Sequence, residues 1–147
     1  MLKSKTFLSE ILAATIILLF VYTATSKFLN YHSFVNALSK STLINSYSTS
    51  LAPIIPTSEY VISIFLFVPR YRLIGFVMAT FSMFCFTLYI AYMLLFTPDL
   101  PCSCGGVLQG LGWKEHLIFN ICFMVLSALG WAAERKVNLK KTNILLQ

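Results

Sequence analysis

The sequence predicts an all-α integral membrane protein, a four-helix bundle with both termini on one side of the bilayer. Its 147 residues are 58% hydrophobic and only 11% charged, whereas about a quarter of the residues in soluble domains are charged. Four apolar runs each approach the roughly 20 residues that a helix needs to cross a bilayer. These runs are continuous, not alternating, so they favour helices over a β-barrel. We therefore expect a single transmembrane domain over residues 1–147.

The four predicted helices differ in how clearly the sequence marks them. The first has no charged residue between Glu10 and Lys27. The second is weaker because it contains Pro53, Pro56 and Glu59, although prolines suit the first turn of a helix. The third is uncharged throughout, and the fourth follows a glycine-rich segment. The expected ranges are about residues 7–28, 51–68, 73–96 and 114–133.

The links between these runs have distinct characters. In the first link, about residues 29–50, Phe34, Val35 and Leu38 recur at helical spacing. This spacing predicts a short amphipathic helix at the membrane interface. The other two segments are expected to be an outward cysteine and glycine loop at 97–113 and a cytoplasmic tail at 134–147.

The basic residues predict which side of the membrane each link faces. Eight of the eleven Lys and Arg residues lie at the N-terminus, between the second and third helices, and in the C-terminal segment. Four spans place these regions on one side, so the positive-inside rule puts both termini in the cytoplasm. The chain is then a multi-pass inner (cytoplasmic) membrane protein whose cysteine loop faces the periplasm. Its net charge of +6 does not indicate nucleic-acid binding, because too little polar surface remains for such a face.

Two cysteines lie one residue apart in the stretch DLPCSCGGVLQGLGWKEHLIFN, residues 99–120. An outward loop meets an oxidising compartment, where disulfides persist. Neighbouring thiols such as Cys102 and Cys104 can exchange with a disulfide through a mixed-disulfide intermediate, and a strained disulfide is an oxidising one. We therefore favour a redox pair. Two alternatives stay open: a structural pair, and a zinc or copper site that adds His116.

Ionisable residues near this loop are the next candidates. His116 and Asn120 are four residues apart and share one helix face. A histidine can take up a proton near neutral pH and help form a thiolate. Glu59 lies within an apolar helix, where an ionisable side chain indicates function. Its expected partner is Lys27 or His116.

The topology predicts that these polar residues converge in the outer half of the bundle, beneath the cysteine loop. Trp113 is expected to anchor the interface or cover the site, and Tyr89 and Tyr92 to line it. Cys85 and Cys122 lie within apolar helices and are expected to behave as small buried hydrophobic residues.

Three stretches resemble the MauE family of membrane proteins within the broader DoxX-like group, especially redox-associated members of the Bacteroidetes type. They are TATSKFLNYHSF, LAPIIPTSEY and CSCGGVLQGLGWKEHLIFN. The resemblance implies a four-helix protein of methylamine utilisation that supports disulfide formation in a periplasmic partner, the small subunit of methylamine dehydrogenase. The family is also similar in architecture to vitamin K epoxide reductase and to disulfide-forming membrane enzymes, which implies a quinone as electron acceptor. Those enzymes have a two-residue cysteine spacer and a second pair, which this chain lacks.

The leading hypothesis is a membrane thiol–disulfide oxidoreductase in which Cys102 and Cys104 alternate between dithiol and disulfide. His116 would accept the proton, and Glu59 and Lys27 would set its charge environment. A quinone, a thioredoxin-like protein or a disulfide-containing client would be the redox partner, and no metal is required. A non-enzymatic accessory protein is the principal alternative.

Overall fold

The computed structural model describes residues 2–41, 43–96 and 112–145. Every regular element in these ranges is a helix, which confirms the all-α class. Four of the helices are long and apolar enough to cross a membrane, so the chain is a multi-pass membrane protein. In chain order the elements are α1 (Leu2–Leu29), α2 (Tyr31–Ser39), the 3-10 turn η1 (Asn45–Tyr47), α3 (Ser48–Phe67), α4 (Arg72–Phe96) and α5 (Trp113–Leu145).

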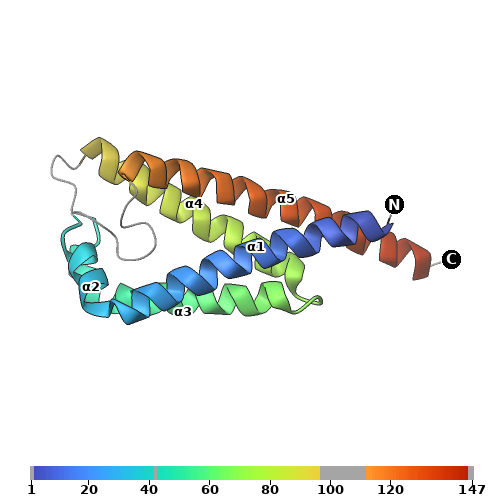
Figure 1. Cartoon of the computed structure of the whole chain (residues 1–147), viewed down its shortest axis with the longest axis horizontal. Coiled ribbons are helices and arrows are strands. Elements are labelled where there is room, and N and C mark those ends of the chain that lie inside the picture. The colour runs from blue at the N-terminus through green and yellow to red at the C-terminus, as the bar shows by residue number, and fades with distance from the viewer. Residues whose placement is uncertain (1, 42, 97–111, 146–147) are drawn as a thin grey trace.

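The four long helices run antiparallel along the long axis of the molecule (Figure 1). Both chain ends lie at one end, here called the terminal end, and α2 lies at the opposite end, here called the loop end. α1 packs chiefly on α3, and α4 packs chiefly on α5, while α1 also contacts α5 and α3 contacts α4. The result is an up-and-down bundle formed by two helix pairs.

The helix ends depart from the expected ranges at two places. α5 continues to Leu145, well past the expected end near residue 133, because neither Gly nor Pro follows Gly130 and the Lys, Arg and Leu residues there favour a helix. α3 begins at Ser48, so Pro53 and Pro56 lie inside the helix and not in its first turn.

The predicted amphipathic helix is α2. Its apolar side chains Phe34 and Leu38 are buried against Ala52 of α3, while Ser33 and Asn36 on its other face are exposed. This packing holds α2 across the loop end of the bundle.

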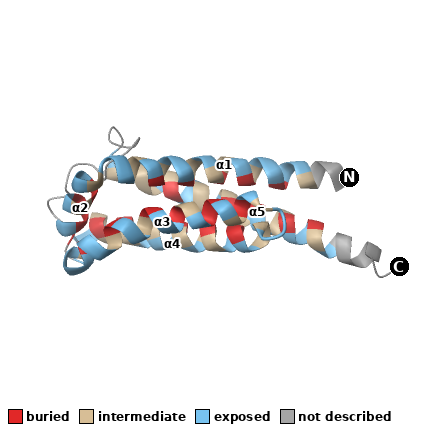
Figure 2. Cartoon of the chain, turned by 90° about the horizontal axis from the view of Figure 1, so that it is seen from below, coloured by how far each residue is buried: buried red, intermediate tan, exposed pale blue. Residues whose placement is uncertain are grey.

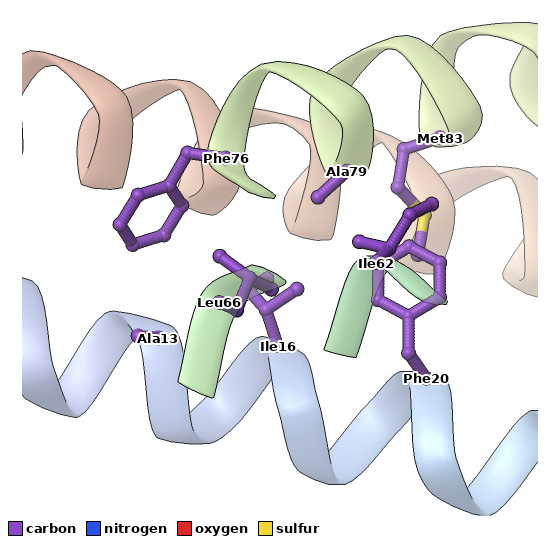
Figure 3. Close-up of a cluster of buried hydrophobic side chains, with 8 residues drawn as sticks. All are labelled: Ala13, Ile16, Phe20, Ile62, Leu66, Phe76, Ala79 and Met83. Atoms are coloured by element: carbon purple, nitrogen blue, oxygen red, sulfur yellow. The ribbon is translucent and has the colours of Figure 1, made fainter. Parts of the chain in front are cut away.

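An apolar cluster fills the middle of the bundle (Figure 3). Its side chains come from α1, α3 and α4 and recur at three- or four-residue spacing, which keeps each set on one helix face. Figure 2 shows that buried residues follow the inward faces, while exposed residues cover the outside. Many of those exposed side chains are large and apolar, as lipid contact allows. The cluster consists of Ala13, Ile16, Phe20, Ile62, Leu66, Phe76, Ala79 and Met83.

Two glycines allow close helix contacts next to this cluster. A Cβ atom on Gly75 of α4 would lie 2.7 Å from the backbone nitrogen of Leu66 in α3. A Cβ atom on Gly130 of α5 would overlap the ring of Phe76. The backbone of Leu66 cannot move aside as a flexible side chain could, so Gly75 is the more demanding position.

Gly75→Ala is expected to lower the free energy of unfolding by about 1–3 kcal/mol, because the added methyl overpacks against the α3 backbone. Alanine is the better helix former, so a loss of stability would be due to packing. Unfolding in mixed micelles, followed by circular dichroism, measures it. Ile74→Ala, at the exposed neighbouring position, is the control and should change stability less. Wild-type stability of Gly75→Ala would contradict the close contact.

Candidate functional site

A buried ion pair joins α1 and α3 toward the loop end. The Nζ atom of Lys27, in the last turn of α1, contacts Oε1 of Glu59 in α3. The two side chains are 13% and 3% exposed. Opposite charges in so apolar a place stabilise each other, and either one alone would carry a large desolvation penalty. The sequence predicted either Lys27 or His116 as the partner of Glu59, and the structure shows that it is Lys27.

Aromatic rings from two further helices surround the Lys27 ammonium group. Its Nζ atom lies 5.2 Å from the ring centroid of Phe86 in α4 and 5.8 Å from that of Phe34 in α2. At such distances the negative face of a ring attracts a cation. Lys27 thus contacts α2, α3 and α4 at once, and sequence reasoning identified neither ring as part of the site.

α5 contributes His116 and Asn120. Ser9 of α1 hydrogen-bonds to Glu134 of α5, which sets the register of this antiparallel pair. Lys27 follows Ser9 by 18 residues on α1, and His116 precedes Glu134 by 18 residues on α5. Because the two helices are antiparallel, Lys27 and His116 lie at the same level of the bundle. The half-buried imidazole is close enough to Lys27 for the two to interact electrostatically. Asn120 is buried one turn further into the bundle.

Two buried polar atoms of this site lack a hydrogen-bond partner among the described residues. They are Oε2 of Glu59, an acceptor, and Nδ2 of Asn120, a donor. The hydroxyl of Thr23 lies beside the Glu59 carboxylate, and the register places Thr23 level with Asn120. A buried polar group without a partner costs about 1–3 kcal/mol, and such groups commonly bind water or a ligand. The site therefore offers one acceptor and one donor to a small polar group.

The remaining predicted site residues occupy different positions. Trp113 opens α5 and is half-buried. Tyr89 and Tyr92 are half-buried on α4, and the ring of Tyr92 lies 4.9 Å from that of Phe96. Cys102 and Cys104 lie outside the described residues.

The expectation that Cys85 and Cys122 are buried was wrong, because both thiols are exposed on the bundle surface. Each is part of an apolar helix face that points outward. Sequence alone cannot separate a lipid-facing from a core-facing thiol, since both environments are apolar.

A second polar cluster, which the sequence did not lead us to predict, lies at the terminal end. The Ser9 hydroxyl donates to the buried Glu134 carboxylate, and Nη1 of Arg72 lies 4.0 Å from the same oxygen. The Nε atom of Arg72 donates to the backbone oxygen of Leu66 over 3.3 Å. One cluster therefore joins α1, α3, α4 and α5.

A signal for this cluster exists in the sequence of α5. Asn120, Ser127 and Glu134 are spaced seven residues apart, and all three are buried. Ser127 shares a hydrogen bond of 2.9 Å with Thr80 of α4. A polar residue at every second turn of an apolar helix indicates an inward polar stripe.

No group of three His, Cys, Asp or Glu side chains in the described part of the chain is arranged to hold a metal ion. A quinone, in contrast, fits the chemistry of the available groups: Asn120 Nδ2 and the Lys27 ammonium can donate to a carbonyl oxygen, and Glu59 Oε2 can accept from a hydroxyl.

Comparison with protein families matches residues 5–133 to the family described as methylamine utilisation protein MauE. Curated proteins yielded no match, and neither did solved structures.

Lys27→Met is expected to lower the free energy of unfolding by about 3–5 kcal/mol, because it leaves the Glu59 carboxylate buried without its counter-charge. Glu59→Met should cost a similar amount for the converse reason. The double variant should lose clearly less than the sum of the two, as measured by unfolding in mixed micelles. Lys40→Met, at an exposed lysine of the same end, should have little effect. Additive losses in the double variant would argue against a buried pair.

Proposed function

Because the chain belongs to the MauE family, we propose that it serves methylamine utilisation as a membrane accessory protein that exchanges thiols and disulfides with an exported partner. The observation that carries this proposal is the polar site at the loop end. The buried Lys27–Glu59 pair, His116 and Asn120 gather at the end where α4 stops and α5 begins. The segment connecting those two helices contains both cysteines of the CSC motif.

The proposed step is a thiol–disulfide exchange. A thiolate of the exported client attacks the Cys102–Cys104 disulfide, and a mixed disulfide forms as the first S–S bond breaks. The second client thiolate then displaces the bound cysteine. The client loses two electrons and gains a disulfide, while Cys102 and Cys104 gain two electrons and take up the two client protons. The same step in reverse would reduce a client disulfide.

The buried side chains have separate roles in this proposal. His116 is half-buried at the start of α5, so it would exchange protons between the thiols and water. Lys27 and Glu59, which form a buried ion pair, would set the charge environment of His116. Asn120 and Trp113 would orient groups that enter from the loop end.

Reoxidation of the cysteine pair requires a two-electron acceptor. A quinone bound at the loop end would supply that chemistry, and Asn120, Lys27 and Glu59 are the residues that would hold it. Alternatively, the disulfide of a thioredoxin-like protein in the periplasm would accept the same two electrons and two protons and become a dithiol.

The proposal places the loop end in the periplasm and the terminal end in the cytoplasm. Support comes from the basic residues, which concentrate at the chain termini and in the link between α3 and α4. The Cys102–Cys104 pair would then face an oxidising compartment.

Thiol alkylation with mass spectrometry tests the proposal on the full chain in membranes. A Cys102–Cys104 disulfide should form under mild oxidation, and dithiothreitol should open it. His116→Gln should slow its exchange with a model dithiol at neutral pH about a hundredfold, which is within the range for loss of a general base.

The Cys85→Ser/Cys122→Ser double variant is the matched control, because both thiols lie on the bundle surface and the exchange should persist without them. If Cys102 and Cys104 stay freely alkylatable under oxidation, and their serine variants still support methylamine growth, the redox role is wrong and a non-enzymatic accessory role takes its place. Stoichiometric zinc or copper in the purified protein would favour the metal alternative.

A further inference from the structure

The formal charge of the chain is concentrated at one end of the bundle. Chain order assigns eight basic residues and two acidic ones, Glu10 and Glu134, to the terminal end. The remaining three basic and three acidic residues of the chain cancel, so the net charge of +6 equals the surplus of these eight basic residues over Glu10 and Glu134. The eight basic residues are Lys3, Lys5, Arg70, Arg72, Arg135, Lys136, Lys140 and Lys141.

Of the two acidic residues at this end, Glu10 is exposed and Glu134 is not. Glu134 is buried and already engaged by Ser9 and Arg72. Outside this cluster, Arg135 and Lys136 of α5 point to the exterior of the bundle. Both charges are therefore exposed at the surface of the bundle.

Two aromatic residues lie at the same level as these charges. The guanidinium of Arg135 lies 5.5 Å from the ring of Trp131, and both side chains are exposed. The contact of Arg72 with Glu134 brings the link that contains Arg70 and Tyr71 to the level of Arg135. Both link residues are also exposed. We call Arg70, Tyr71, Trp131, Arg135 and Lys136 the terminal-end girdle.

Exposed residues along α5 show where the girdle lies relative to the bilayer. Val125 and Leu129 are exposed and apolar, as lipid tails require. Within two turns the exposed residues become Trp131, Arg135 and Lys136. Aromatic rings followed by basic side chains are typical of the headgroup level of a membrane.

From this arrangement we propose that the terminal-end girdle binds the headgroups of anionic phospholipids. An anionic headgroup has the charge that complements the basic girdle. It also lies at the depth in the membrane at which aromatic and basic residues gather. Clusters of Lys and Arg next to a transmembrane helix attract anionic lipids. This binding site lies at the end of the bundle opposite His116 and Asn120.

Native mass spectrometry of the detergent-purified full chain tests the site by titration with phosphatidylglycerol or phosphatidylcholine of identical acyl chains. At low salt the protein should bind phosphatidylglycerol at least fivefold more tightly, and the preference should shrink as NaCl increases. Arg135→Gln/Lys136→Gln should remove most of the preference.

Lys40→Gln/Lys114→Gln is the matched control, since it removes two exposed charges from the loop end and should leave the preference intact. Circular dichroism would verify that both double variants fold, and Lys136→Gln alone should give a partial loss. Equal binding of the two lipids, or an equal loss in both double variants, would overturn the proposal.

Discussion

The Lys27–Glu59 ion pair is the interaction on which the arrangement of the loop end depends. Neither charge could be buried alone at this depth, so α1 and α3 must meet where the two side chains reach each other. The rings of Phe34 and Phe86 then enclose the ammonium group, which brings α2 and α4 to the same place. His116 of α5 completes the surroundings. The ion pair and the rings around it thus join α1, α2, α3 and α4 at one place.

The bundle has a polar cluster toward each end, and the residues between them are mostly apolar, apart from the hydrogen bond of Thr80 with Ser127. On α1 the apolar residues Ala13, Ile16 and Phe20 fall between Ser9 and Lys27, and α3 and α4 show the same order. Oε2 of Glu59 and Nδ2 of Asn120, the buried atoms without a partner among the described residues, lie toward the loop end. That is the end at which the proposed exchange with an exported partner would take place.

The sequence predicted the helices well, because lipid allows few other structures and long uncharged runs are unambiguous. It also named Glu59 as a candidate with Lys27 or His116 as its partner, since an ionisable residue at that depth demands a counter-charge, and the structure shows the pair with Lys27. It could not identify Phe34 and Phe86 as the rings beside the Lys27 ammonium group, because aromatic residues are common throughout this chain. The lipid-facing positions of Cys85 and Cys122 were missed for a related reason: core and lipid select the same apolar side chains.

The two ends of the bundle differ in charge, and each end is therefore proposed to bind a different kind of partner. At the loop end the buried charges cancel, so the site favours uncharged polar groups and would repel neither a thiol nor a quinone. At the terminal end Ser9 and Arg72 engage Glu134, and the positive charges of Arg70, Arg135 and Lys136 lie on the surface. α5 connects the two ends as one continuous helix from Trp113 to Leu145. Because headgroups would hold Arg135 and Lys136 at a set depth, they would also set the depth of His116 and Asn120 at the other end of the same rigid helix.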